Sequence, residues 1–335
     1  MSGKKDGMDS KSFKQKWPLW QKLAILGLII VIVVPLSVGL GVGLGNKSND
    51  GDSTSDSDES NPDNTTNTTT NATFWQPEAG DSWQIVLLSP IKIDKESLSP
   101  DVKVWDLDLY DNDAETFQAL AKMGKKTICY FSAGSWENWR DDKDDFHKSD
   151  LGSVMDGWPD ERWLNVRSEN VRKIMKKRIA YAAEKGCDAI DPDNVDGFQN
   201  ENGVDLTQND AVDYVKFLSE TAASYNMSTG LKNAADLISS VLHYVHFSVN
   251  EECVLYSECD MFSPFIKAGK PVFHIEYPSG APNKMSTSDV KEICSHSGNA
   301  TGTEGFSTVI KKLKLDGWVE YCNSSKTFTT EVEAE

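Results

Sequence analysis

Short β-rich runs alternate with helical segments from residue 84 onward, and this alternation limits the possible folds more than any other feature. The repeated order of strand and helix predicts an α/β domain with a parallel sheet. Eight candidate strands in about 262 residues match the size of a (β/α)8 TIM barrel, which we expect over residues 74–335. The strands are expected at residues 84–88, 103–109, 127–132, 189–193, 228–231, 246–249, 272–277 and 306–310.

Three helical patterns lie between these strands, at residues 113–123, 169–185 and 208–225. Ser168 and Thr207 stand at the N-cap positions of the second and third patterns. Residues 133–165 form a long insertion after the third strand, and no helix is evident after Ile310. The chain has no G-x-G-x-x-G turn and no Walker sequence, which argues against the doubly wound nucleotide-binding folds.

Residues 23–44 carry no charged side chain and are long enough to cross about 30 Å of hydrocarbon as a helix. We expect a transmembrane signal anchor at residues 23–45 after a cytoplasmic basic tail at residues 1–22, which contains six lysines. This arrangement predicts a single-pass type II membrane protein with its main domain extracellular or lumenal, in the plasma membrane or the secretory pathway. Cleavage of the run as a signal peptide, near residues 39–45, is the alternative.

Residues 46–73 consist mainly of Asn, Thr, Ser and Asp, a composition that cannot bury enough apolar surface to order the chain. We expect a disordered, glycosylated stalk, whose cleavage would shed the domain. N-glycosylation sequons begin at Asn46, Asn64, Asn67 and Asn71 in the stalk and at Asn226, Asn299 and Asn323 in the domain.

All six cysteines follow the predicted anchor, on the side of the membrane where disulfides persist. Cys253 and Cys259 can close a short loop, and Cys294 can pair with Cys322 in the tail. The remaining two, Cys129 and Cys187, would then be paired or buried as thiols. Six cysteines allow 15 connectivities, so the spacing does not decide among them.

The chain carries 52 acidic and 34 basic side chains, a net charge of −18. This balance argues against nucleic-acid binding, which depends on Lys and Arg at phosphates, and it suits a cationic ligand. We expect a monomer.

Polar residues end most of the predicted strands, at the edge where a (β/α)8 barrel places its active site. Two carboxyls facing each other across such a mouth are what glycosidic bond cleavage needs, and the ten tryptophans and nine tyrosines offer flat faces to sugars. The candidates are Asp106, Asp108, Tyr130, Ser132, Trp136, Asp191, Asp193, Asn194, Asp196, Lys232, Asn233, Asn250, Glu251, Glu276 and Tyr277.

Metal and serine chemistry fit these residues poorly. The acids from Asp191 to Asp196 resemble a calcium loop, but the Gly and Glu positions of an EF-hand are not in register. The five histidines form no HExxH pattern, and the segment Ser132–Ser135 is not a G-x-S-x-G elbow. We therefore expect no metal site.

Several strings, in the right order, resemble glycoside hydrolase family 114, the fungal and bacterial endo-α-1,4-polygalactosaminidases. They span about residues 75–280, and the last 55 residues match least clearly. The strings are Asp106–Asp111, Ile128–Glu137, Gly186–Phe198, Gly230–Asn233, Val249–Cys253, Glu258–Asp260 and Ile275–Tyr277.

The resemblance implies a (β/α)8 barrel that cuts α-1,4-linked galactosamine in galactosaminogalactan-type polysaccharide of fungal walls and biofilm matrix, without a cofactor. It makes Asp193 the nucleophile and Glu251 the general acid/base, with the other candidates shaping sugar subsites. A catalytically silent barrel that tethers matrix polysaccharide is one alternative. A glycosidase of another α-galactoside specificity is the second. The anomeric outcome depends on the separation of the two carboxyls.

Overall fold

The computed structural model describes residues 74–93, 98–322 and 326–333. The predicted tail, anchor and stalk lie outside the described residues, together with the sequons at Asn46, Asn64, Asn67, Asn71 and Asn323. Within the described part of the chain, no helix has the length and apolar character of a membrane span.

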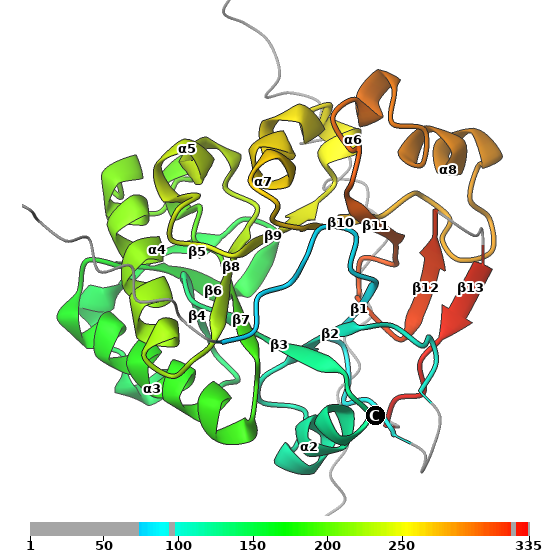
Figure 1. Ribbon diagram of the computed structural model, residues 1–335. Coiled ribbons are helices and arrows are strands. Elements are labelled where there is room, and N and C mark those ends of the chain that lie inside the picture. The colour runs from blue at the N-terminus through cyan, green and yellow to red at the C-terminus, as the bar shows by residue number, and fades with distance from the viewer. Residues whose placement is uncertain (1–73, 94–97, 323–325, 334–335) are drawn as a thin grey trace, which may run out of the picture. The chain divides into compact units, whose positions relative to one another are not determined.

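All eight predicted strands are present, and they pair in parallel in chain order, as neighbouring labels in Figure 1 show. Their bounds lie within a few residues of the predicted ranges, and most of their residues are buried in the domain. They are β1 Trp83–Val86, β2 Val104–Asp108, β3 Lys126–Ser132, β7 Ala189–Asp193, β8 Ser228–Lys232, β9 Phe247–Glu251, β10 Val272–Glu276 and β11 Ser307–Ile310.

The prediction of a closed barrel needs correction, because no ladder of backbone hydrogen bonds joins β11 to β1 among the described residues. After β11 the chain turns back as two antiparallel strands, β12 Trp318–Tyr321 and β13 Lys326–Thr329, instead of forming an eighth helix. Side chains bridge the two edges: the Trp83 indole donates to Ser307 O (2.7 Å), and Lys311 Nζ donates to Ile85 O (2.7 Å). The result is an α/β domain with a ten-stranded sheet.

The three predicted helices are α2, α3 and α4. Thr207 caps α4 in a capping box, since its backbone N donates to Asp210 Oδ2 (2.8 Å) and its hydroxyl accepts from Asp210 N (3.3 Å). Ser168 precedes α3, but its hydroxyl donates to Asp150 Oδ1 (2.6 Å) instead of capping the helix. The α-helices are α2 Ala114–Lys122, α3 Glu169–Lys185, α4 Gln208–Ala223, α5 Ile238–Val241, α6 Cys253–Tyr256, α7 Ser263–Lys267 and α8 Thr287–Ile293. The 3-10 turns are η1 Lys143–Asp145, η2 Lys148–Asp150, η3 Gly197–Gln199, η4 Ala235–Leu237, η5 Cys259–Phe262 and η6 Gly298–Ala300.

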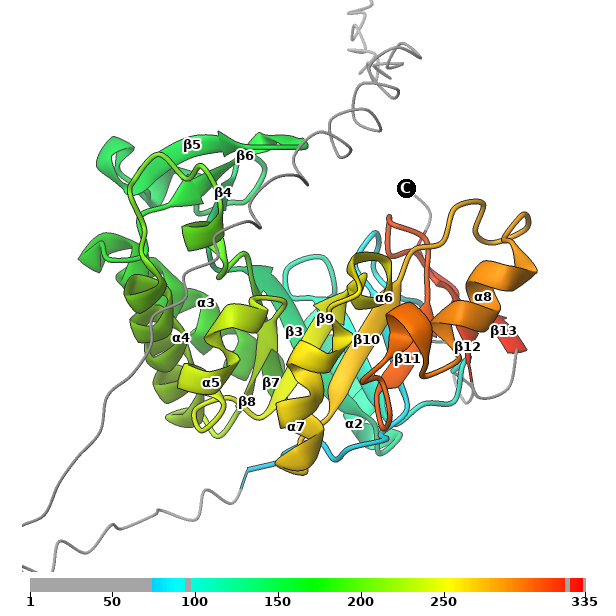
Figure 2. The ribbon, with the colours of Figure 1, turned by 90° about the horizontal axis from the view of Figure 1, so that it is seen from above.

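The insertion at residues 133–165 contains a small antiparallel sheet of order β4-β6-β5. Its strands are β4 Ser135–Glu137, β5 Leu151–Met155 and β6 Trp158–Leu164. Because β4 follows β3 directly, the small sheet starts at the carboxyl end of the parallel strands. Figure 2 shows it standing apart from the main sheet.

Three disulfides cross-link the domain. Cys253–Cys259 and Cys294–Cys322 confirm the two predicted pairs, and Cys129–Cys187 resolves the choice left open for the other two cysteines. The sequon residues Asn226 and Asn299 are exposed, and their glycosylation stays a prediction.

Candidate active site

Three charged residues end three adjacent strands, Asp193 on β7, Lys232 on β8 and Glu251 on β9. Lys232 Nζ lies 3.3 Å from Asp193 Oδ2 and 3.2 Å from Glu251 Oε2. The lysine side chain is only 2% exposed, whereas the carboxylates are 17% and 23% exposed. The ammonium is therefore buried between two carboxylates that solvent can reach.

Hydrogen bonds fix both carboxylates. The Tyr130 hydroxyl donates to Asp193 Oδ2 (2.8 Å). Glu251 accepts at Oε1 from the Tyr277 hydroxyl (2.5 Å) and at Oε2 from Asn233 Nδ2 (3.0 Å). These donors come from neighbouring parallel strands, whose carboxyl ends converge at one edge of the sheet, so the site is oriented before any ligand enters.

Lys232 sets the charge state of the site. Burial would raise the pKa of Glu251, but attraction to Lys232 and the hydrogen bonds from Tyr277 and Asn233 lower it below its ordinary value. Burial acts against the charged form of Lys232, yet Asp193 and Glu251 raise its pKa well above the ordinary value. Lys232 is thus protonated and Glu251 ionised at neutral pH.

Two further carboxyls, Asp106 on β2 and Asp191 on β7, are fully buried, and none of their oxygens has a hydrogen-bond partner among the described residues. Burial raises the pKa of Asp191 to about 7, with Lys232 opposing the shift. Burial, followed by repulsion from Asp191, raises the pKa of Asp106 well above its ordinary value. With no exposed surface, these carboxyls do not contact a ligand in this structure, and burial favours their protonated form.

Several other predicted residues lie beside this group. Asn194 donates from its backbone N to Asp193 Oδ1 (2.7 Å) and from Nδ2 to the Ser132 hydroxyl (2.9 Å). Asn250 is buried next to Glu251 in β9, and its Oδ1 has no partner among the described residues. Burial raises the pKa of Asp196 to about 6, with Asp193 adding to the shift.

Three predicted residues lie in networks of their own. Asp108 accepts from Arg140 (2.7 Å) in a buried ion pair. Glu276 Oε1 lies 2.8 Å from His274 Nε2 and accepts from Val254 N (2.7 Å). Trp136 is half-buried, and its indole N–H donates to the carbonyl of Lys143 (3.0 Å). Among the described residues, none of these three side chains forms a hydrogen bond or an ion pair with Asp193, Lys232 or Glu251.

The structure adds Glu161 of β6, which no sequence motif marks because it lies in the insertion at residues 133–165. Its Oε2 accepts from the Ser135 hydroxyl (2.5 Å), and Ser135 also contacts the Ser132 hydroxyl (2.5 Å). Burial raises the pKa of Glu161 to about 7. This chain of contacts connects the small sheet, through the Ser132 hydroxyl, to Asn194, which directly follows Asp193.

The backbone is left-handed directly after each charged strand end. Asn194 has φ 62°, Asn233 and Ala234 have φ 48° and 51°, and Glu252 has φ 61°. Such conformations cost of order 1–3 kcal/mol for residues other than glycine and concentrate at functional sites. Four of them around one group of charges mark this edge as the candidate active site.

A cavity of about 530 Å³ opens over Glu251 and Tyr277. Its lining contains five acids and none of the basic residues that the structure describes. Burial raises the pKa of one of these acids, Glu252, to about 7. The lining residues are Trp158, Asp196, Gln199, Asn233, Ala234, Ala235, Asp236, Glu251, Glu252, Tyr256, Glu258, Met261, Phe262, Tyr277 and Leu313.

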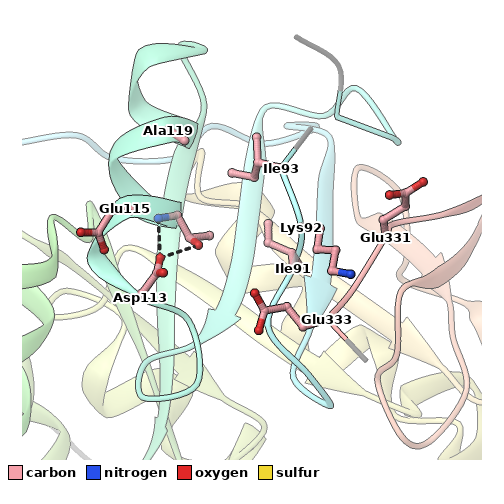
Figure 3. Close-up of a pocket in the computed structure, with 9 residues that line it drawn as sticks. Ile91, Lys92, Ile93, Asp113, Glu115, Ala119, Glu331 and Glu333 are labelled. Carbon is pink, nitrogen blue, oxygen red and sulfur yellow. Dashed lines mark hydrogen bonds between the residues drawn. The ribbon is translucent and has the colours of Figure 1, made fainter. Parts of the chain in front are cut away.

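A second cavity, of about 490 Å³, lies against α2 and shares no lining residue with the first. Figure 3 shows Asp113 at its edge, where this carboxylate accepts from the Thr116 backbone N and hydroxyl (both 2.8 Å) as the cap of α2. This cavity contains no predicted site residue.

Cys253, Cys259 and His274 have metal-ligand spacing, but the two sulfurs form a disulfide and offer no thiolate.

Comparisons with known proteins agree with this geometry. The family model for glycoside-hydrolase family GH114 matches residues 64–327. The crystal structure of Aspergillus fumigatus Ega3 in complex with galactosamine is 50% identical, covers 74% of this chain and 97% of that chain, and superposes with a TM-score of 0.69. The glycoside hydrolase domain of PelA from Pseudomonas aeruginosa shares the fold at 11% identity, with 75% and 99% of the two chains covered and a TM-score of 0.55. A search of curated proteins finds no match.

Proposed function

Since the chain belongs to glycoside hydrolase family GH114, we propose that it is an endo-acting enzyme that cleaves α-1,4-linked galactosamine in galactosaminogalactan-type polysaccharide. The observation that carries this proposal is that two carboxylates, Asp193 and Glu251, both form ion pairs with Lys232 at the carboxyl ends of the parallel strands. The acidic cavity beside them suits a polymer of ammonium-bearing sugars. The 50% identical relative was crystallised with galactosamine, which supports the same sugar here.

We propose hydrolysis with retention of configuration, because the nearest oxygens of the two carboxylates are no farther apart than the lower limit for an inverting pair. The two oxygens that contact Lys232 Nζ, at 3.3 and 3.2 Å, are at most 6.5 Å apart, the sum of those contacts. Retaining glycosidases hold their carboxyls about 5–5.5 Å apart, whereas inverting ones need about 6.5–9.5 Å to admit a water. One carboxyl, ionised, would attack the anomeric carbon while the other, in its protonated form, gives its proton to the leaving oxygen. The second group, now ionised, would then take a proton from the water that attacks the anomeric carbon and releases the sugar from the first carboxyl.

The charge state of the two carboxyls raises the question of which one is the nucleophile and which the general acid/base. The resemblance makes Asp193 the nucleophile, but the lowered pKa and three donors of Glu251 are what a nucleophile requires. Azide added to Asp193→Gly and Glu251→Gly variants separates the assignments. With an activated α-galactosaminide, azide yields an α-glycosyl azide from the variant that lacks the acid/base and a β-glycosyl azide from the variant that lacks the nucleophile.

The first experiment incubates the full-length protein with deacetylated and N-acetylated α-1,4-galactosamine oligomers and identifies the products by mass spectrometry. We expect cleavage of the deacetylated oligomers and a loss of at least about 100-fold in Glu251→Gln. Binding of the oligomers without any product would overturn the proposal and favour a tethering barrel. Cleavage restricted to other α-galactosides would overturn the substrate while keeping the enzyme class.

We also propose that residues 23–45 anchor the enzyme in the membrane with the catalytic domain outside the cytoplasm. The uncharged run and the lysines before it support this topology. Alkaline carbonate extraction of cell membranes should leave the protein in the pellet, and protease added to intact cells or vesicles of known orientation should show which side the domain occupies. Release into the soluble fraction would contradict the anchor.

A further inference from the structure

Exposed apolar side chains gather at the cavity beside Glu251. Ten large hydrophobic side chains are exposed among the described residues, and four of them line this one cavity. They are Trp158, Tyr256, Met261 and Leu313. Grouped exposure of this kind leaves apolar surface in water and marks a binding surface.

Trp158 has the most informative position of the four. It is the first residue of β6 and pairs with Met155 of β5, so it lies at the tip of the hairpin that rises from the insertion. Its side chain is 56% exposed. Gly157, with φ 80°, provides the left-handed turn that precedes it.

The hairpin that carries Trp158 is fixed at its base. Leu164 N donates to Gly134 O (2.9 Å), and the Arg162 guanidinium donates to Gly152 O (2.9 Å from Nε). Such an arm fixes the backbone position of Trp158 before a ligand arrives, which lowers the entropy cost of binding.

The chemistry around Trp158 matches one class of ligand. Asp196, Asp236, Glu252 and Glu258 line the same cavity, and none of the described lining residues is basic. An indole face packs on the C–H face of a sugar and attracts an ammonium, while carboxylates accept its N–H bonds. A cationic amino-sugar chain satisfies both requirements, whereas a neutral sugar leaves the acids unpaired.

We infer that Trp158 is a distal sugar-binding residue, which holds a galactosaminyl unit of the polymer at the hairpin tip while the bond to be cut lies at Asp193 and Glu251. Because Trp158 lies on the hairpin and not at a strand end, it would hold a sugar other than the two whose bond is cut, and so set the preference for long chains over short ones. The inference rests on the proposed function.

The test compares Trp158→Ala with wild type, in the full-length protein, on the shortest cleaved galactosamine oligomer and on the polymer. We expect KM for the polymer to rise about tenfold and kcat to stay unchanged, as loss of one stacked cation–π contact predicts. KM for the shortest oligomer should change less than about twofold. Trp158→Phe, which keeps an aromatic face, should restore most of the polymer affinity.

Trp139→Ala is the matched control, because Trp139 is also exposed (52%) but does not line the cavity. It should leave both KM values unchanged. The inference would be overturned if Trp158→Ala raised KM equally for short and long substrates, or if Trp139→Ala had the same effect as Trp158→Ala. Cleavage by wild type would still support the proposed function in either case. If wild type cleaves nothing, the proposed function fails. In that case, affinity electrophoresis in a gel that contains the polymer tests the inference. If the polymer retards Trp158→Ala as much as wild type, the inference is overturned.

Discussion

At the scale of single residues, the site depends on one buried cation between two acids. Lys232 holds Asp193 and Glu251 within 3.3 Å of the same nitrogen and keeps the pKa of Glu251 low. Without this charge the two carboxylates would repel each other, and the pKa of Glu251 would rise. Lys232 therefore belongs to the catalytic machinery as much as the carboxylates do.

Lys232→Met should lower kcat about 100-fold, as removal of a preorganised electrostatic contact does. It should also move the acidic limb of the pH profile of kcat/KM to higher pH, because the pKa of Glu251 rises when its counter-charge is lost. Lys185→Met is the control: Lys185 is buried as well, but it donates to the carbonyl of Leu109 (2.7 Å) away from the site. A profile that shifts equally in both variants would contradict this role.

The sequence predicted polar side chains at the ends of β7, β8 and β9, and the structure brings them together because neighbouring ends of parallel strands must meet. Their catalytic role stays a prediction. The sequence could not separate Asp108 from these groups, since its partner Arg140 lies 32 positions further along the chain. The orientation of a strand-end carboxyl is decided by such distant partners, which periodicity does not reveal.

At the scale of elements, the loop after β9 is closed by the Cys253–Cys259 disulfide, six positions apart, directly beyond Glu251 and Glu252. The Cys294–Cys322 disulfide spans 28 positions and joins α8 to the tail. Because a cross-link removes more chain entropy from the unfolded state when its loop is longer, Cys294–Cys322 should stabilise the fold by about 3.5 kcal/mol and Cys253–Cys259 by about 2 kcal/mol. The position of the shorter loop gives it the larger influence on the site.

We predict that replacing both cysteines of one disulfide with serine has opposite effects in the two cases: the disulfide that matters more for stability should matter less for kcat. The Cys253/Cys259 variant should lose less stability and more kcat, because Glu252 is held in a left-handed conformation beside the site. The Cys294/Cys322 variant should lose more stability and little kcat. Denaturant unfolding and turnover on the same preparations provide the comparison, and equal kcat in the two variants would count against the positioning role.

The small sheet was the element that sequence reasoning missed. Its β6 strand, with the sequence WPDERWL, starts with a tryptophan and a proline and changes from exposed to buried along its length, so no regular alternation marks it. The hairpin is specified by contacts with the β3 end, such as the Leu164 bond to Gly134 O, which only the folded chain brings together.

At the scale of the whole molecule, the order of eight parallel strands follows from the sequence pattern, but their closure does not. The final segment forms β12 and β13 where a barrel would add its last helix. Lys311 and Trp83 join the edges through side-chain hydrogen bonds, and such bonds have no periodic signature. The fold class was therefore predictable, whereas the way in which the sheet ends was not.

The whole domain should be more stable in mild acid than at neutral pH. Several buried acids have a raised pKa, including Asp191, Glu161 and Glu252, each to about 7. Between about pH 4, where these groups titrate in the unfolded chain, and pH 7, the folded state holds more protons than the unfolded state, so stability falls as pH rises. The net charge of −18 adds self-repulsion in the same direction.

Glu251 acts in the opposite sense, because its pKa is lowered in the folded state. Its contribution to stability is present above its unfolded pKa of about 4.3 and disappears as pH falls through its lower folded value. Thermal unfolding across a pH series should therefore give the highest Tm near pH 5, with a decline toward pH 8 and another in stronger acid. Asp191→Asn should flatten the decline between pH 5 and 8, since its amide does not titrate, and a Tm that rises over that range in wild type would refute the expectation.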